Sequence, residues 1–331
     1  MKNYFFTNAW ISGFTQSDGS FVVSWDKQKK GIPVRPQPIF NLTQSISDYD
    51  MFVALQKHLG VGRVHKNRNN VTFVVTSIDD LLKIIIPIFE DCPLRSSKQL
   101  SFQIFKLVFL MMKAKTHLTL AGTLIILELS YFMNKDTSFR TEATKEAIIQ
   151  ELSLYALKSG IKLPNMTELK VPLLDETKPT APITKEFIRG LVDGDGSFNI
   201  SFKTDRRRIG TNFTVVHEIS SIEALNELVE FFGCGAVYKL PSQAARYQVE
   251  NLTDILTKIL PFFDQMEFNT VKQDHFKKFS DVCKYIATNG YKSDKDLQHV
   301  VDIAWDMNKG GKTRRITKVA YLAKFISLTK K

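Results

Sequence analysis

Two aspartates close two nearly identical stretches of the chain, and carboxylates in such places can hold a divalent metal. Residues 11–21 and 188–198 both end on Asp-Gly-Ser-Phe, with Asp18 in the first copy and Asp195 in the second. Each copy has the pattern of a short apolar helix that ends at the aspartate and leads into a strand. Adjacent carboxylates repel each other unless a cation lies between them, and hard divalent ions prefer oxygen ligands. We therefore predict that Asp18 and Asp195 bind metal.

Small residues recur four positions apart in both stretches, Gly13 with Ser17 and Gly190 with Gly194. Glycine inside a helix costs about 1 kcal/mol relative to alanine, so two in one short helix need a reason. Close approach of another backbone supplies one. We expect the two motif helices to pack on each other along these strips, which would bring the two aspartates side by side.

Each half also places a lysine in the first turn of a later helix, Lys98 and then Lys272. An ammonium there opposes the helix dipole, and one such lysine alone would be read as a solvated surface residue. The two lie 174 positions apart, as do the Met-Asn-Lys runs at 133–135 and 307–309. This recurrence favours a role in proton transfer or in stabilising a phosphate. The residues expected to cap the two helices are Ser96 or Ser97 and Asn269 or Thr270.

The elements that must position these residues recur in one order: helix, two strands, helix, two strands, helices. Prolines predict an edge position for the strand at 34–43 and a break at Pro87 in the helix at 78–89. A chain of 331 residues allows two domains. We predict an α+β fold whose domains are two repeats, and the expected ranges are 1–140, a proline-rich connection at 141–182, and 183–331.

The expected strands alternate apolar with polar or basic side chains, and this pattern allows a DNA-binding face. A two-stranded ribbon fits the major groove, where Arg, Lys, Gln and Asn read base edges. An ordinary solvated sheet face is the alternative, but basic hairpin turns recur at matching places, where phosphates would lie. The predicted DNA contacts are Ser24, Asp26, Lys27, Gln28, Lys29, Lys30, Arg35, Gln37, Asn41, Arg63, His65, Asn67, Thr72, Asn199, Ser201, Lys203, Asp205, Arg206, Arg207, Arg208, Arg246 and Gln248.

Charge and composition agree with a polyanionic partner. The net charge is +11 and the pI is near 9.4, which favours nucleic acid over an anionic membrane. The apolar runs at 84–89 and 107–112 fall short of the ~20 residues that a spanning helix needs. Three scattered cysteines support neither a disulfide framework nor a zinc site. The first motif begins so early that we expect no signal peptide, and a protein that is cytosolic or made inside an organelle.

The two motifs and the polar-alternating strands resemble the LAGLIDADG family of homing endonucleases, in its single-chain, two-repeat form. Residues 115–119 and the Met-Asn-Lys runs are similar to segments of organelle intron-encoded members. The resemblance implies two pseudo-symmetric αββαββα repeats, forming a saddle of antiparallel sheets around two central packed motif helices. It departs at Gln16, where aspartate is common, and at Arg189, where a small residue is common.

The resemblance also implies roles for the site residues. Asp18 and Asp195 would bind two or more Mg²⁺ ions at the interface of the motif helices. Each aspartate would serve the cleavage of one DNA strand. Lys98 and Lys272 would be the basic residues of the site. The residues that would order the water at the metal are Gln44 and Glu218.

The implied activity is a staggered double-strand cut, with 3′ overhangs, at a long and largely asymmetric site in duplex DNA. The expected protein is a monomer without an obligate protein partner, because a duplicated chain supplies both halves of a dimer. It is expected in a mitochondrion, with chloroplast or prokaryotic cytoplasm as alternatives. The first rival function is an RNA maturase that assists splicing of its host group I intron. The second is a silent DNA-binding regulator, which the retained aspartates and lysines disfavour.

Overall fold

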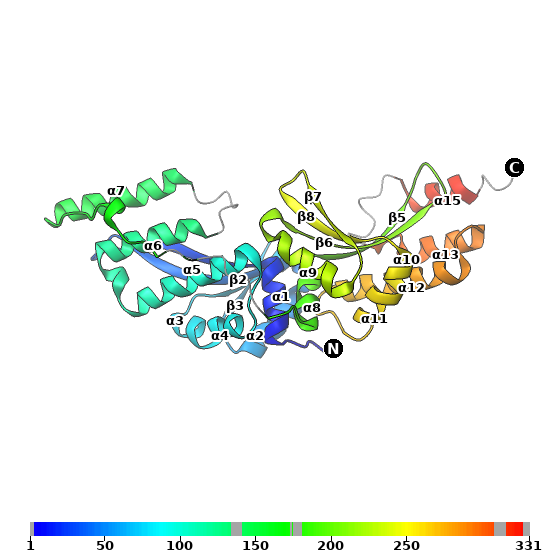
Figure 1. The fold of residues 1–331 in the computed structure, drawn as a ribbon, viewed down its shortest axis with the longest axis horizontal. Coiled ribbons are helices and arrows are strands. Elements are labelled where there is room, and N and C mark those ends of the chain that lie inside the picture. The colour runs from blue at the N-terminus through cyan, green and yellow to red at the C-terminus, as the bar shows by residue number, and fades with distance from the viewer. Residues whose placement is uncertain (1–2, 134–140, 173, 175–180, 308–315, 327–331) are drawn as a thin grey trace. The chain divides into compact units, whose positions relative to one another are not determined.

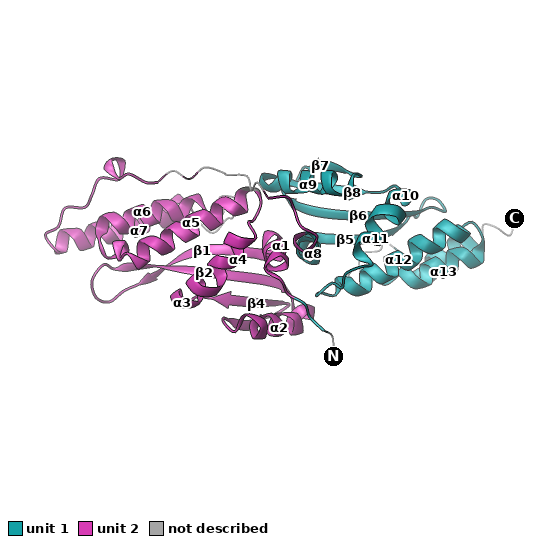
Figure 2. Ribbon diagram, turned by 60° about the horizontal axis from the view of Figure 1, so that its bottom comes forward, with its two compact units in different colours: residues 1–5, 188–331 teal, residues 6–187 magenta. Residues whose placement is uncertain are grey.

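The structure, a computed structural model, describes residues 3–133, 141–172, 174, 181–307 and 316–326. The chain divides into two compact units, which Figure 2 colours separately. The first unit is Phe6–Phe187, and the second is Ile188–Lys331 together with Met1–Phe5.

The first unit contains the first motif, one sheet and the helices that cover it (Figure 1). Its elements in chain order are α1 (Asn8–Asp18), β1 (Gly19–Lys27), β2 (Val34–Ser45), η1 (Ile46–Asp48), α2 (Tyr49–Leu59), β3 (Arg63–Asn67), β4 (Asn70–Val75), α3 (Ile78–Asp80), η2 (Leu81–Ile85), α4 (Ile86–Asp91), α5 (Ser96–Lys113), η3 (Thr116–Leu118), α6 (Leu120–Phe132), α7 (Glu142–Lys158) and η4 (Met166–Glu168).

The second unit repeats this order from the second motif helix, inside which the division between the units falls. Its elements are α8 (Lys185–Asp195), β5 (Gly196–Phe202), β6 (Ile209–Glu218), η5 (Ile219–Ser221), α9 (Ile222–Phe232), β7 (Ala236–Leu240), β8 (Ala244–Val249), α10 (Leu252–Asp254), η6 (Ile255–Ile259), α11 (Leu260–Phe263), α12 (Lys272–Asn289), α13 (Asp294–Ala304) and α15 (Lys318–Ile326).

Each unit builds one four-stranded antiparallel sheet with an aromatic core on one face. The strand orders are β1-β2-β4-β3 and β5-β6-β8-β7, so the topology is the same in both. Ring centroids lie 5.4 Å apart for Phe21 and Phe40, and 5.1 Å apart for Phe198 and Phe213. Helix α5 packs on β1, and α12 packs on β5. The predicted α+β fold of two repeats is confirmed, whereas the packing of the motif helices on each other stays a prediction.

The prediction that the second strand lies at a sheet edge is wrong, because β2 pairs with both β1 and β4. However, β4 pairs only with the part of β2 from Phe40 onward, whereas Pro36 and Pro38 pair with β1 alone. The missing proline N–H groups therefore face the side of β2 that carries no partner strand.

Pro87 does not break its helix, contrary to the prediction. The π-helical turn η2 leads directly into α4, where Pro87 occupies the first turn, and η6 leads in the same way into α11 with its Pro261. A π turn moves the hydrogen-bond ladder by one residue, which accommodates an imino acid without an N–H. Both repeats therefore place a π-helical turn before a helix that has proline in its first turn.

Helix α7 lies in the stretch that was expected to connect the repeats. It packs beside α6 (Figures 1 and 2), with Leu152 and Ala156 buried against Leu120, Leu124 and the β2 residue Val34. It follows α6 as α15 follows α13 in the second unit. The boundary at residue 140 thus precedes a helix that packs on the first unit, and the limits of the repeats stay a prediction.

No described helix has the length and apolarity that a membrane crossing requires. The cysteines Cys92, Cys234 and Cys283 are free thiols, as their spacing predicted. Burial raises the pKa of the Cys283 thiol to about 12, so this group stays neutral.

Candidate functional site

The first unit brings its three predicted catalytic residues together at the end of α1. Asp18 is the last residue of α1, and the amide Nε2 of Gln44 donates a hydrogen bond of 2.8 Å to Asp18 Oδ2. Lys98 Nζ donates to the backbone oxygens of Gly19 at 2.8 Å and Thr15 at 3.2 Å. The ammonium thus lies at the negative end of the α1 dipole, which offsets its unfavourable place at the start of α5.

The second unit builds the same arrangement around Asp195, the last residue of α8. Lys272 Nζ donates to the backbone oxygen of Asp193 at 2.7 Å and also to that of Gly194. Each unit therefore places a lysine ammonium on backbone oxygens at the end of its motif helix.

The side chain beside Asp195 is His217, and Glu218 does not take the place that Gln44 takes beside Asp18. His217 Nδ1 lies 3.0 Å from Asp195 Oδ2, although the contact does not meet hydrogen-bond criteria and this buried oxygen accepts none. Gly19 pairs with Leu42, two residues before Gln44, and Gly196 pairs with Val215, two residues before His217. His217 is therefore the register equivalent of Gln44.

Strand alternation could have identified His217 from the sequence. Gln44 continues the inward-facing series Phe40 and Leu42, and His217 continues the series Phe213 and Val215. Glu218 has the opposite parity, and its Oε1 accepts a hydrogen bond of 3.5 Å from the Ser221 hydroxyl. A shift of one residue along a strand moves a side chain to the other face.

Side chains two residues before the aspartates fix the start of the lysine helices. Asp193 is fully buried, and its carboxylate accepts bonds from the backbone N–H of Thr270 at 3.0 Å and of Asn269 at 3.1 Å. The Thr270 hydroxyl also donates to it, at 2.7 Å. In the first unit Gln16 Oε1 accepts from the backbone N–H of Arg95 at 2.8 Å. The departure at Gln16 thus keeps the connection, but the acceptor is a neutral amide oxygen in place of a carboxylate.

These contacts replace the predicted cap in the first unit, whereas the predicted cap Thr270 is present in the second. Helix α5 begins at Ser96 after Arg95, and α12 begins at Lys272 after Val271, and neither preceding residue supplies a side-chain cap. The Thr270 hydroxyl oxygen does accept a bond of 3.3 Å from the Lys272 N–H. The long-range connection from the motif helix is therefore the main link that positions each lysine.

Arg189, the second departure, holds backbone within the second unit. Its guanidinium donates to the Glu267 oxygen at 2.8 Å and to the Phe5 oxygen at 2.9 Å, and it lies 5.7 Å from the Phe5 ring centroid. With a side chain only 2% exposed, Arg189 ties the N-terminal residues to this unit.

The first sheet carries most of its predicted DNA contacts on the face opposite the aromatic core. Its register pairs Asp26 with Arg35 and Ser24 with Gln37. The other residues of this face are Asn41, Arg63, His65, Asn67 and Thr72, and the exposed turn holds Gln28, Lys29 and Lys30.

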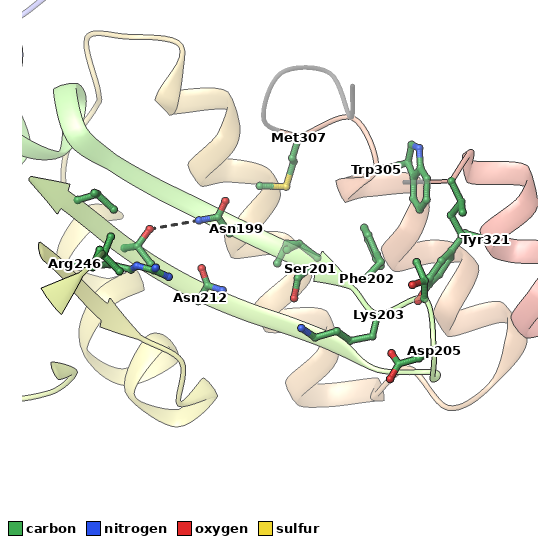
Figure 3. Close-up of a pocket in the computed structure, with 16 residues that line it drawn as sticks. Asn199, Ser201, Phe202, Lys203, Asp205, Asn212, Arg246, Trp305, Met307 and Tyr321 are labelled. Atoms are coloured by element: carbon green, nitrogen blue, oxygen red, sulfur yellow. Dashed lines mark hydrogen bonds between the residues drawn. The ribbon is translucent and has the colours of Figure 1, made fainter. Parts of the chain in front are cut away.

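The second sheet carries a hollow of about 730 Å³ on its polar face (Figure 3). Its floor includes the predicted contacts Asn199, Ser201 and Arg246, and Trp305 and Tyr321 form the opposite wall. Residues that the sequence reasoning missed, Asn212, Thr214 and Val216, also line it. Further predicted contacts are Gln248 on β8 and Lys203, Asp205, Arg206 and Arg208 around the turn.

Two predicted phosphate contacts point elsewhere. Lys27 has the strand parity of the buried Phe21, and its ammonium lies 2.7 Å from Glu151 of α7. Arg207 bonds Asp294 of α13 at 2.9 Å, and its side chain is only 18% exposed. We therefore assign Arg207 to packing of the outer helix, whereas Lys27, whose side chain is 82% exposed, stays a predicted DNA contact.

The fold and site define a class of protein: two copies of one α+β unit, each ending a motif helix on an aspartate beside a lysine ammonium. The model of the LAGLIDADG endonuclease family matches residues 11–109 and 188–283. The chain belongs to this family.

Among known relatives, a probable intron-encoded DNA endonuclease 1 of Mycosarcoma maydis is 43% identical over 272 residues, covering 82% of this chain and 97% of the relative. A probable intron-encoded endonuclease 2 of Neurospora crassa is 26% identical and matches 89% of this chain but 64% of its own length. The solved structure of the meganuclease I-SmaMI bound to DNA is similar with a TM-score of 0.79 and 24% identity, covering 94% of this chain and 99% of that one.

Proposed function

We propose that this protein is a site-specific homing endonuclease that makes a staggered double-strand cut, with 3′ overhangs, in a long and largely asymmetric duplex DNA target. The observation that carries the proposal is the paired site: Gln44 contacts Asp18 and His217 contacts Asp195. In each unit a lysine ammonium, Lys98 or Lys272, bonds the backbone oxygen of the glycine next to that aspartate. One carboxylate site in each repeat suits one cut in each strand. The test is strand-resolved cleavage by the wild type and by variants of the two aspartates.

The donor groups of each site fit Mg²⁺. No group of three or more His, Cys, Asp or Glu side chains suited to a metal occurs in the part of the chain that the structure describes. Mg²⁺ is usually held by one or two carboxylates together with substrate phosphates and water, which matches one aspartate in each unit. Asp195 Oδ2 is buried, and the group that lies beside it is His217 Nδ1 at 3.0 Å. A bound Mg²⁺ would supply Lewis acidity and a water of lowered pKa.

The protein groups have separate tasks in this proposal. Gln44 and His217 hold the aspartates beside which the scissile phosphates would bind. Lys98 and Lys272 are fixed by backbone oxygens at the ends of the motif helices. Their ammonium groups would stabilise negative charge that grows on the phosphate and the leaving 3′ oxygen.

Replacing His217 and Glu218 one at a time tests which of the two side chains acts beside Asp195. We expect His217→Ala to slow cleavage of one strand by about 10- to 100-fold, because Asp195 loses a positioning contact, a loss of roughly 1.4 to 2.7 kcal/mol. Glu218→Gln should leave both strands cut at the wild-type rate. End-labelled duplexes resolved on denaturing gels measure each strand. If Glu218→Gln slowed cleavage and His217→Ala did not, Glu218 would be the residue that acts beside Asp195.

DNA affinity should fall steeply with salt, since four cations, Lys29, Lys30, Arg206 and Arg208, are exposed in or beside the hairpin turns. Replacing all four with glutamine should reduce the slope of log affinity against log salt by about 4. Arg207→Gln is the matched control, because its loss should lower thermal stability and leave the slope unchanged. A wild-type slope near zero would contradict phosphate binding.

An RNA maturase for the host group I intron is the alternative class. A basic sheet face would bind RNA as well, but RNA binding does not require a carboxylate beside a lysine in each repeat. We further propose, from the intron-encoded relatives, an organelle-encoded protein of the mitochondrion that acts as a monomer.

A further inference from the structure

A row of three paired residues crosses the polar face of the second sheet. Val216 on β6 pairs with Arg246 on β8, and Arg246 pairs with Tyr238 on β7. Val216 is 39% exposed and Tyr238 is 53% exposed, so two large apolar side chains flank an arginine on a face that is otherwise polar. The composition of this row differs from its surroundings.

The first sheet has a different row at the equivalent register. There Thr43 pairs with Thr72, and Thr72 pairs with His65. The hydroxyls of Thr43 and Thr72 lie 3.0 Å apart and satisfy each other. The row with an arginine between apolar side chains thus occurs in the second of the two sheets.

Arg246 is held in one orientation. Its Nη1 donates a bond of 3.2 Å to Gln248 Oε1, and Gln248 Nε2 in turn donates to Glu250 Oε1. Its Nε is buried and makes no hydrogen bond. Arg246 borders the hollow opposite Trp305 and Tyr321 (Figure 3), where its terminal nitrogens, and not the buried Nε, would meet a ligand.

We propose that this row reads one two-base step of the target, with Arg246 on a guanine and Val216 on the 5-methyl group of an adjacent thymine. The proposal rests on the proposed function. Arginine binds guanine O6 and N7 through two hydrogen bonds, and an apolar side chain distinguishes thymine by its methyl group. A phosphate contact fits Arg246 less well, because this residue lies within a strand of the sheet and is oriented by its neighbours, unlike the exposed cations of the turns.

The experiment is selection of bound duplexes from a randomised DNA library by the full-length protein in Ca²⁺, followed by sequencing. The wild type should enrich guanine strongly at one position. Arg246→Ala should reduce the preference for that guanine from about 10- to 100-fold to about onefold, with the other positions unchanged. Arg246→Gln should move the preference to adenine, which glutamine reads through N6 and N7. Val216→Ala should weaken only the neighbouring thymine.

Thr72→Ala, at the equivalent position of the first sheet, is the matched control and should leave the guanine preference intact. An unchanged guanine preference in Arg246→Gln would overturn the proposal. This test holds even if Arg246→Ala does not fold. Failure of the wild type to select any duplex would instead sink the proposed function. Thermal melting of each variant separates loss of reading from loss of fold.

Discussion

Asparagine in place of Asp18 should convert double-strand cleavage into nicking or abolish it, and asparagine in place of Asp195 should affect the other strand in the same way. Asparagine keeps the shape of the side chain but removes the charge that would hold Mg²⁺. The loss of several kcal/mol of transition-state stabilisation corresponds to a rate about 10³-fold lower for the affected strand. Affinity for the target in Ca²⁺ should stay within about tenfold.

The measurement uses a duplex target recovered by selection and labelled differently on its two strands. Asp281→Asn is the matched control, because it makes the same chemical change at an exposed position of α12 that is not among the predicted DNA contacts. We expect this control to cut both strands. Full double-strand cutting by both single variants would disprove the assignment of Asp18 and Asp195 to the metal.

Asp193→Ala should lower the free energy of unfolding by about 3 to 5 kcal/mol. The buried Asp193 carboxylate accepts hydrogen bonds from Asn269 and Thr270, and bonds to charged groups contribute roughly 1.5 to 3 kcal/mol each. Gln16→Ala, in the first unit, removes a neutral acceptor of the Arg95 N–H and should cost less, about 1 to 2 kcal/mol. Urea unfolding followed by circular dichroism measures both changes.

Asp193→Asn provides an intermediate test, because it keeps the shape but loses the charge and one acceptor. We expect its stability to lie between those of the wild type and Asp193→Ala. Equal and small losses for Gln16→Ala and Asp193→Ala would show that the buried carboxylate does not anchor α12. Lys272 would then owe its position to packing of the helix instead of the contact with α8.

The two sites differ chemically although the repeats share one topology. An amide from Gln44 contacts Asp18, whereas an imidazole from His217 contacts Asp195. The connection to the lysine helix is neutral in the first unit and carries a carboxylate in the second. The protein therefore has two related but unequal centres, which suits an asymmetric target.

Local patterns in the sequence were enough to define the fold class and to single out the aspartate and the lysine of each candidate site. The two motifs end helices on Asp18 and Asp195, and alternation along the strands separates the core from the polar face. Lys98 and Lys272 followed from equal spacing alone. Such features are predictable because helix ends, strand alternation and repetition depend on residues close in the chain or on a simple count.

Tertiary structure decided which distant side chains meet. The second hairpin has strands of 7 and 10 residues where the first has 9 and 12, so His217 and not Glu218 reaches the helix-end aspartate. In the same way Arg207 binds Asp294 in a later helix, which no pattern near the turn indicates. These contacts depend on strand register and on packing between elements far apart in sequence, and a change of one residue in register reverses the face of every side chain that follows.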